Sequence, residues 1–170
     1  MTVLSREEIK SLIDGKSPLV VDYVDLEAQL QPNGFDMSLR DVAAMHSAGF
    51  IGVNNASRVL PPASPLAFDG TGALYLEPGS YLITYNEIVQ LPENVMALGR
   101  PRSSLLRCGV AVHNAVWDAG YHGRSQSLLV VYNPQGFRLE RNARVVQLVF
   151  FKLSRATRRG YRGAYQNENV

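Results

Sequence analysis

The strongest candidate for ligand chemistry in this chain is a run of cations and hydroxyls that contains Arg102, Ser103, Ser104 and Arg107. Arginine supplies planar paired donors, serine supplies a short donor, and the N–H groups of a turn or helix start complete a cradle for an anion. The segment is therefore predicted to bind phosphate. A surface loop with a capped helical turn is the alternative explanation of the same residues.

A second candidate is the carboxylate of Asp118, which stands directly after Trp117 and shortly before Tyr121. A carboxylate in such a place can take a proton from a water molecule and act as a general base. A turn-forming aspartate without any catalytic role is the alternative. His113 and His122 lie nearby, but neither has a carboxylate or a second histidine at metal-ligand spacing, so neither is predicted to bind a metal.

Two further polar groups interrupt apolar or turn-like sequence. Asp36 follows the turn formers at residues 32–34, where it either holds a cation or accepts a hydrogen bond within the turn. Arg144 and Gln147 open a strand that becomes strongly apolar, and they either face a ligand or are solvated on an edge strand. Neither of these two groups, considered alone, is sufficient evidence for a ligand site.

The elements that position these groups are predicted to be mostly antiparallel strands. Short runs rich in β-branched and aromatic residues predict strands at 19–24, 81–85, 110–112, 127–132 and 145–153. The turn formers between them leave too little chain for crossover helices. A capping-box spacing between Ser5 and Glu8 predicts one short N-terminal helix, and residues 44–65 read as a long loop. The polar composition of residues 155–170 favours a mobile tail.

Composition narrows the class of protein. The 170 residues predict a single domain over 1–170, and 46% hydrophobic with 19% charged residues is typical of soluble proteins. The net charge of +2 does not indicate a nucleic acid polymer as partner, and no run is long enough to span a membrane. A single cysteine, Cys108, and an N-terminus without an export signal favour the cytoplasm. Phosphate-loop, His-Glu-x-x-His and zinc deaminase motifs are missing from the sequence.

Taken in order, the four polar segments resemble the signature motifs of the trimeric dUTPase and dCTP deaminase superfamily. Residues 33–37, 101–105, 117–123 and 144–148 are similar to its Ala-Gly-Tyr-Asp-Leu, Pro-Arg-Ser-Gly/Ser-Leu, Ile-Asp-x-x-Tyr-x-Gly and Arg-Ile-Ala-Gln-Leu motifs. Residues 160–166 are similar to the C-terminal arm of its archaeal-type members. A chance match to four motifs in the same order is improbable.

The resemblance implies a mainly β fold, a distorted β-barrel of the β-clip type with a short N-terminal helix, and a homotrimer whose chains share the active sites. It implies dUTP as the substrate and Mg²⁺ as the cofactor. Asp118 would activate the attacking water, and Asp36 would support the magnesium ion through water. The remaining residues implied to bind substrate are Arg102, Ser103, Ser104, Arg107, Arg144 and Gln147 for the phosphates, Asn114, Val116 and Trp117 for the base, Tyr121 beside the sugar, and Tyr161, Arg162, Tyr165 and Gln166 in an arm, residues 155–170, that closes over the active site.

One position separates the two activities of this superfamily. The deaminases carry a glutamate two residues before the Tyr-Asn pair that ends the strand after the third motif, and here that residue is Val130. Deamination would therefore lack its acid and base, and hydrolysis of dUTP to dUMP and pyrophosphate is predicted. The alternatives are a dCTP deaminase, with or without dUTPase activity, and a non-catalytic module that binds deoxynucleotides for regulation.

Overall fold

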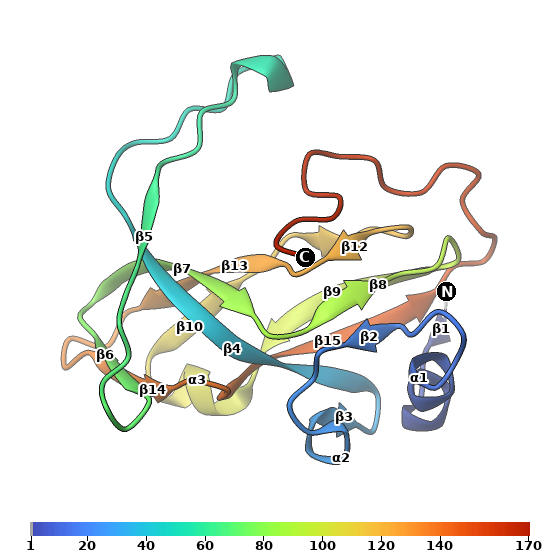
Figure 1. Cartoon of the computed structure of the whole chain (residues 1–170), viewed down its shortest axis with the longest axis horizontal. Coiled ribbons are helices and arrows are strands. Elements are labelled where there is room, and N and C mark those ends of the chain that lie inside the picture. Colours follow the sequence, from blue (N-terminus) through green and yellow to red (C-terminus); the bar gives the residue numbers. More distant parts are fainter. Residues whose placement is uncertain (1) are drawn as a thin grey trace.

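The computed structural model describes residues 2–170, and it is mainly β (Figure 1). The helices are α1 (Arg6–Ile13), α2 (Leu26–Gln29) and α3 (Ser103–Arg107), with a 3-10 turn η1 (Asn55–Ser57). The strands are β1 (Thr2–Val3), β2 (Val20–Val21), β3 (Leu30–Gln31), β4 (Gly34–Met45), β5 (Ala63–Pro65), β6 (Ala73–Leu76), β7 (Gly79–Tyr85), β8 (Ile88–Gln90), β9 (Val95–Pro101), β10 (Val110–His113), β11 (Val116–Trp117), β12 (His122–Gly123), β13 (Gln126–Val131), β14 (Phe137–Glu140) and β15 (Arg144–Lys152).

A curled sheet of ten strands forms the body, and its main path runs β10-β13-β7-β4-β15-β9-β11. Smaller sheets, β12-β8-β2 and β14-β6, complete the fold. Every strand pair is antiparallel, as the short connections predict. The two strands at the centre, β4 and β15, each carry residues of a predicted motif, so the sheet itself fixes how those motifs lie relative to each other.

The core is built on the alternation of the central strands. Phe35, Met37 and Leu39 on β4 and Leu148 and Phe150 on β15 are fully buried. Burying a large apolar side chain contributes about 1.5–3 kcal/mol, so these positions anchor the strands in one register. The residues between them on β4 are therefore held at defined positions as well.

The glycine at the start of β4 is required by the closeness of β15. A Cβ atom on Gly34 would lie 2.5 Å from the carbonyl oxygen of Leu148 and 2.6 Å from Nε2 of Gln147. Such contacts are well inside van der Waals distance, so a side chain here would push the two strands apart. The glycine of the first motif thus brings Gln147 close to the beginning of β4.

The N-terminal helix α1 has the cap that its sequence predicts. Ser5 Oγ accepts a hydrogen bond from the Glu8 amide at 3.3 Å, and the Ser5 amide donates to Glu8 Oε2 at 2.8 Å. Ile9 and Ile13 are buried against the body. None of the helices described between residues 2 and 170 is long and apolar enough to cross a membrane.

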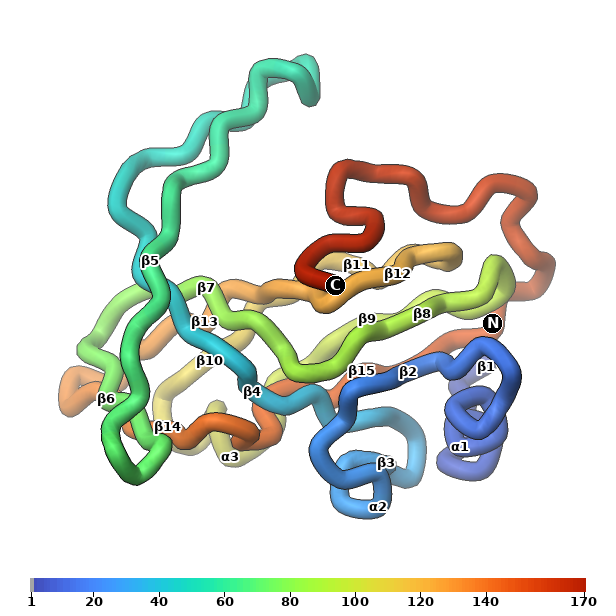
Figure 2. The backbone as a smooth tube through the Cα atoms, in the orientation of Figure 1, coloured from blue at the N-terminus to red at the C-terminus, as the bar shows by residue number. Residues whose placement is uncertain are grey.

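Two segments leave the body (Figures 1 and 2). Residues 46–62 project away from the sheet as a long hairpin, and the chain after β15 runs back over the fold so that its C-terminus lies beside β12. The predicted loop at 44–65 is shorter than expected, because β4 continues to Met45 and pairs there with β5. The strand predicted at 19–24 is confined to Val20–Val21.

Candidate active site

The polar residues of β4, β9 and β15 form a cluster around one buried carboxylate. Asp36 is only 1% exposed, and its Oδ2 lies 3.2 Å from Nε of Arg102 and 3.3 Å from Nη1 of Arg144. Arg144 also donates to the carbonyl oxygen of Ala28. The side chains of Arg102 and Arg144 are each 34% exposed, so both arginines are held by Asp36 and still reach the solvent.

Opposing effects act on the pKa of Asp36. Burial raises the pKa of this carboxyl, while the charges of Arg102 and Arg144 lower it by a smaller amount, so that the pKa is raised overall. Asp36 Oδ1 is buried and has no hydrogen-bond partner among the described residues. With two arginines around one carboxylate, the cluster presents cationic donors to the solvent and suits an anionic ligand.

Strand register explains how distant residues reach this cluster. Gln147 is paired with Asp36 on one side and with Arg100 on the other. The amide of Arg102 donates to the carbonyl of Val145 at 3.0 Å, which fixes the start of α3 beside β15. Ser103, Ser104 and Arg107 lie on α3 with exposed side chains. The second and fourth motifs therefore present their polar groups together.

A buried network of hydrogen bonds stabilises the backbone around Asp36. Glu87 is fully buried and accepts hydrogen bonds from the Ser38 amide at 2.9 Å, from Ser38 Oγ at 2.5 Å and from Gln29 Nε2 at 2.6 Å. Gln29 Nε2 also donates to the carbonyl of Asp36 at 2.8 Å. Burial raises the pKa of Glu87 more than its hydrogen bonds lower it. The backbone around Asp36 is thereby held by polar contacts as well as by the sheet.

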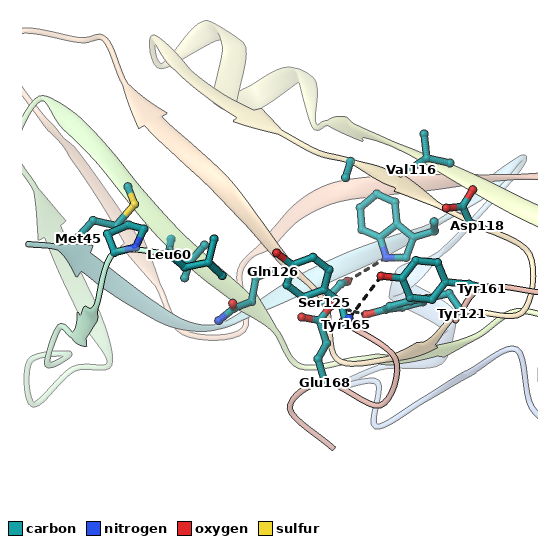
Figure 3. A pocket seen from close by; sticks show the side chains of 14 residues that line it. Met45, Leu60, Val116, Asp118, Tyr121, Ser125, Gln126, Tyr161, Tyr165 and Glu168 are labelled. Atoms are coloured by element: carbon teal, nitrogen blue, oxygen red, sulfur yellow. Dashed lines mark hydrogen bonds between the residues drawn. The ribbon is translucent and has the colours of Figure 1, made fainter. Parts of the chain in front are cut away.

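The third motif lies at a different place, in a cavity of about 710 Å³ (Figure 3). Asp118 is exposed on its wall, beside Trp117 and Tyr121, and the arm contributes Tyr161, Tyr165 and Glu168. The remaining lining residues are Met45, Leu60, Pro61, Leu82, Ala115, Val116, Ser125 and Gln126. Among the described residues that line this cavity, none is a lysine or an arginine.

Hydrogen bonds within the protein fix the wall that carries Asp118. The indole N–H of Trp117 donates to Ser125 Oγ at 3.0 Å, which anchors the ring beside the cavity. Asn114 Oδ1 accepts from Ser127 Oγ at 2.6 Å and from the hydroxyl of Tyr85 at 3.1 Å. Burial raises the pKa of the Tyr85 hydroxyl, which keeps it a donor. These hydrogen bonds hold the turn before β11 in place. They also occupy the side-chain oxygen of Asn114.

The ring of Tyr121 is held by the C-terminal arm. Its hydroxyl donates to Oε1 of Glu168 at 2.8 Å, and its ring meets that of Tyr161 edge-on at 5.8 Å. Burial raises the pKa of Tyr121, and the neighbouring Glu168 raises it further. Burial also raises the pKa of Glu168. A carboxylate of the arm thus fixes the orientation of a ring in the cavity.

The arm is bound to its own chain along the segment that follows Asp118. The Tyr161 amide donates to Ala119 at 2.8 Å, the Asn167 amide donates to His122 at 2.7 Å, and the Arg124 amide donates to Glu168 at 2.9 Å. Composition favours a mobile tail here, but the structure gives the segment main-chain partners. Gln166, expected to bind substrate, instead donates to Gly120 and accepts from the His122 amide.

Within one chain the cavity and the arginine cluster are well separated. Trp117 is paired with Ala97 on β9, while the cluster begins after Pro101, four residues further along the same strand. At a rise of about 3.3 Å per residue this separation is roughly 13 Å along the strand. Asp118 lines the cavity, and neither Arg102 nor Arg144 does. One chain therefore presents two half-sites, one acidic and aromatic, the other cationic.

Comparison with known proteins identifies the family. The dCTP deaminase-like family matches residues 3–153. The chain belongs to this family. It is 47% identical to a probable deoxyuridine 5'-triphosphate nucleotidohydrolase of Methanosarcina mazei over 100% of this chain and 99% of that protein, and 49% identical to one of Archaeoglobus fulgidus with the same coverage. The structure resembles that of 2'-deoxycytidine 5'-triphosphate deaminase from Agrobacterium tumefaciens, with a TM-score of 0.63 and 21% identity over 87% of this chain and 47% of that chain.

The expected site residues of this dCTP deaminase-like chain fall into two groups. Asp36, Arg102, Arg144 and Gln147 meet at the cluster, with Ser103, Ser104 and Arg107 beside it on α3. Val116, Trp117, Asp118, Tyr121, Tyr161 and Tyr165 meet at the cavity. Arg162 is exposed on the arm, and Asn114 lies behind the cavity wall.

Two residues that sequence reasoning missed hold the second group in place. Glu168 lines the cavity, and Arg124 is buried with one of its guanidinium nitrogens 2.8 Å from Asp22 Oδ2 and its Nε donating to the carbonyl of Asn169. The sequence gives only a weak signal for either residue. Glu168 is the single acid of a basic segment, and Arg124 follows the third motif directly.

A metal ion finds few ligands in the chain itself. Among residues 2–170, no group of three or more His, Cys, Asp or Glu side chains is placed to hold a metal ion. Asp36 already faces two guanidinium groups, and only its Oδ1 lacks a partner. This donor set fits a cation that a ligand brings with it and that touches the chain through water.

Proposed function

We propose that this protein is a dUTP nucleotidohydrolase, which cleaves dUTP to dUMP and pyrophosphate. Relatives at 42–49% identity over the full chain carry that name. The observation that carries the proposal is the placement of Asp118 on the wall of a cavity lined by Trp117, Tyr121 and Tyr161. A cavity of about 710 Å³ has the size of a nucleotide site. Val130 replaces the glutamate expected of a deaminase.

The two half-sites are proposed to meet between copies of the chain in a homotrimer. The cavity lacks cations among its described lining residues, whereas a triphosphate needs them, and the arginine cluster lies roughly 13 Å further along β9. A heterologous contact that closes a ring places the cavity of each copy beside the cluster of the next. Each site then has an acid from one chain and phosphate donors from its neighbour.

In the proposed reaction Asp118 takes a proton from a water molecule whose oxygen forms a bond to the α-phosphorus. The bond from that phosphorus to the oxygen bridging it to the β-phosphorus breaks, and pyrophosphate leaves with the electron pair. Arg102, Arg144 and the hydroxyls of Ser103 and Ser104 hold the phosphate chain in line and stabilise the charge that develops on the leaving group. Gln147 and Arg107 are proposed to contribute further phosphate contacts.

Mg²⁺ is proposed as the cofactor, bound chiefly by the triphosphate. When bound, it neutralises phosphate charge and fixes one conformation of the chain of phosphates. Asp36 is proposed to support the hydrated ion through water. The same carboxylate keeps Arg102 and Arg144 in place, so Asp36 has a positioning role whether or not the ion is present.

Recognition of the nucleoside is assigned to the cavity. Main-chain groups of residues 112–117 pair with uracil, and a cytosine would leave a buried polar group unpaired at a cost of about 1–3 kcal/mol. Val116 and Trp117 contact the base, and the Tyr121 ring, held by Glu168, leaves no space for a ribose 2'-hydroxyl. Tyr161 or Tyr165 stacks on the base from the arm.

The first test is a substrate panel of dUTP, dCTP, dTTP and UTP, each with and without Mg²⁺, scored for pyrophosphate and for ammonia. Pyrophosphate from dUTP without ammonia from dCTP is expected. The Asp118→Asn variant should bind dUTP as before and turn over more slowly by about two orders of magnitude or more, the scale of a general base. Near-normal turnover of this variant would refute the assignment, and ammonia from dCTP would favour a deaminase.

A mixing experiment tests whether chains share the sites. Asp118→Asn damages the cavity half and Arg102→Ala damages the cluster half, so each variant alone should be inactive. In a randomly mixed assembly a site is intact when both halves are intact, with probability one half times one half, which predicts recovery of about one quarter of wild-type activity. If the site lay within one chain, co-expression of the two variants would recover nothing.

A further inference from the structure

One edge of β4 has no strand partner at the residues that carry the buried carboxylate of the arginine cluster. β3 pairs with β4 as far as Phe35, and β7 pairs with it from Leu39 onward. Residues 36–38 lie between these two pairings, and all three are buried. Buried main-chain groups need hydrogen-bond partners, so this edge must find them outside the strands.

Two buried side chains take the place of the missing strand. Oε2 of Glu87 accepts a hydrogen bond from the Ser38 amide at 2.9 Å, and Nε2 of Gln29 donates to the carbonyl oxygen of Asp36 at 2.8 Å. The two side chains also contact each other, because Gln29 Nε2 donates to Glu87 Oε1 at 2.6 Å. Glu87 therefore holds this edge of β4 by two routes, directly at Ser38 and through Gln29 at Asp36.

The first route leads to both arginines of the cluster. Ser38 is paired with Arg144, and the register of the two strands shifts between Arg144 and Val146, which leaves Val145 as the extra residue of a bulge. The carbonyl oxygen of Val145 accepts from the amide of Arg102 at 3.0 Å. Bulges beside active sites re-aim side chains. The positions of both arginines thus depend on how β4 lies at Ser38.

The second route leads to Arg144 through α2. Gln29 is the last residue of this helix, and its Oε1 accepts from the amides of residues 24 and 25 at 2.8 Å each. With its two donor contacts, the side-chain amide of Gln29 has all of its hydrogen-bonding positions occupied. The carbonyl oxygen of Ala28, in the same helix, accepts from Nη1 of Arg144. A displacement of Gln29 would therefore move the group that holds this arginine.

We propose that Glu87 is a positioning residue for phosphate binding, which keeps Arg102 and Arg144 in the arrangement that binds the anion. This inference rests on the proposed function, because it takes the phosphate chain of the nucleotide as the anion. Glu87 acts through Ser38 and Gln29, whose donors would be left buried and unpaired without its carboxylate. The strand and the helix would then shift, and a displacement of about 1 Å can cost a factor of about a hundred.

The test is the binding of pyrophosphate to Glu87→Gln, measured by isothermal titration calorimetry on the full chain. Glutamine has the shape of glutamate, but it presents a donor where Ser38 and Gln29 also present donors. The dissociation constant for pyrophosphate should rise about tenfold or more, while that for deoxyuridine, which carries no phosphate, should stay unchanged. Arg102→Ala is the positive control and should abolish measurable binding of pyrophosphate.

Two further variants separate positioning from stability. Ile83→Val, at a fully buried position of β7, lowers stability by opening a small cavity and removes no polar group, so it should bind pyrophosphate as the wild-type protein does. Ser38→Ala removes one donor to Glu87 and keeps the main-chain contact, which covers the case that Glu87→Gln does not fold. Its dissociation constant for pyrophosphate should rise about threefold.

The outcomes distinguish this inference from the proposed function. Wild-type affinity for pyrophosphate in the Glu87 and Ser38 variants, or an equal loss of affinity in Ile83→Val, would overturn the positioning role. A wild-type protein that does not bind pyrophosphate would overturn it as well, because the cluster would then not be an anion site. Weakened pyrophosphate binding in the variants of a protein that does not hydrolyse dUTP would support the positioning role and refute the proposed function.

Discussion

The contact between Tyr121 and Glu168 predicts that the C-terminal arm opens more often when the carboxylate is removed. The arm, residues 155–170, is bound over residues 119–124 by main-chain hydrogen bonds and by side-chain hydrogen bonds, of which the contact of Tyr121 with Glu168 at 2.8 Å joins two side chains at the cavity. Because Glu168 lies next to Asn169 and Arg124 in space, it sits where the last bound residues join the cavity. The perturbation is Glu168→Ala, compared with Glu168→Gln.

The expected increase in opening follows from the balance between the entropy cost of ordering the arm and the free energy of its hydrogen bonds. Ordering a residue costs about 1–2 kcal/mol of backbone entropy, and a typical hydrogen bond returns about 0.5–1.5 kcal/mol. An arm held by roughly one hydrogen bond per ordered residue is therefore bound only weakly, and single contacts become visible. A hydrogen bond to a charged acceptor contributes about 1.5–3 kcal/mol when buried, and about 1 kcal/mol is appropriate for a half-buried carboxylate. Losing it should increase opening about fivefold.

Hydrogen exchange is the assay that measures this opening. The Asn167 amide, bound to His122, and the Arg124 amide, bound to Glu168, should both exchange about fivefold faster in Glu168→Ala. Glu168→Gln should show a smaller increase, because its amide oxygen still accepts from Tyr121. Glu140→Gln, at an exposed position on β14, is the matched control and should change neither rate.

A second variant, Tyr121→Phe, tests the same contact from the side of the donor. Tyr121→Phe removes the donor and leaves a half-buried carboxylate without its partner, so exchange should increase by a similar factor. Because both substitutions remove the same contact, the double variant should exchange no faster than either single one. Exchange rates in Glu168→Ala equal to those of the wild-type protein would refute the reasoning, since the arm would then be held by its other contacts without a contribution from Glu168.

Two further predictions concern stability and specificity. Burial raises the pKa of Glu87, so its contribution to stability is greatest below its ordinary pKa of 4.5 and falls as the pH rises through the raised value. Glu87→Gln turns an amide donor toward the donors of Ser38 and Gln29 and should destabilise the protein by about 1–3 kcal/mol. In urea titrations this deficit should shrink as the pH rises above 4.5, and a deficit independent of pH would contradict the assignment. Tyr121→Ala should lower the discrimination between dUTP and UTP by about tenfold or more, measured as the ratio of kcat/KM values, and an unchanged ratio would rule out the steric role of the ring.

The strands with a period of two were predicted correctly from the sequence. Residues 81–85, 110–112, 127–132 and 145–153 lie in or next to β7, β10, β13 and β15. These strands are rich in valine, leucine and isoleucine, and their partners supply the other face of the core. Side-chain pattern alone was sufficient there because burial and strand propensity favour the same conformation.

The longest strand was missed for a physical reason. In β4 the apolar side chains of Phe35, Met37 and Leu39 alternate with Asp36 and Ser38, which is the pattern of a half-buried strand, yet these two polar residues are buried as well. The local sequence predicts a turn acceptor or a cation ligand at Asp36, whereas a buried carboxylate needs partners that lie far away in sequence. Those partners, Arg102 and Arg144, are not visible in the local pattern.

The arm shows the other limit of sequence reasoning. Its composition favours a mobile tail, because few of its side chains can bury apolar surface. In the structure its main-chain groups find partners on residues 119–124, and a main-chain hydrogen bond carries no signature in the side chains. The contact of Glu168 with Tyr121 spans 47 residues. Only the fold brings the two groups together.

The resemblance implies active sites that chains share, but the order of the four motifs does not show which of their residues lie together within one chain. Strand register explains this grouping, because β11 pairs with Ala97 and Leu98 in the middle of β9, while Gln147 of β15 pairs with Arg100 near the end of the same strand. The proposed base, Asp118, and the proposed phosphate donors are therefore separated along β9, which is why the proposed active site combines residues of two chains.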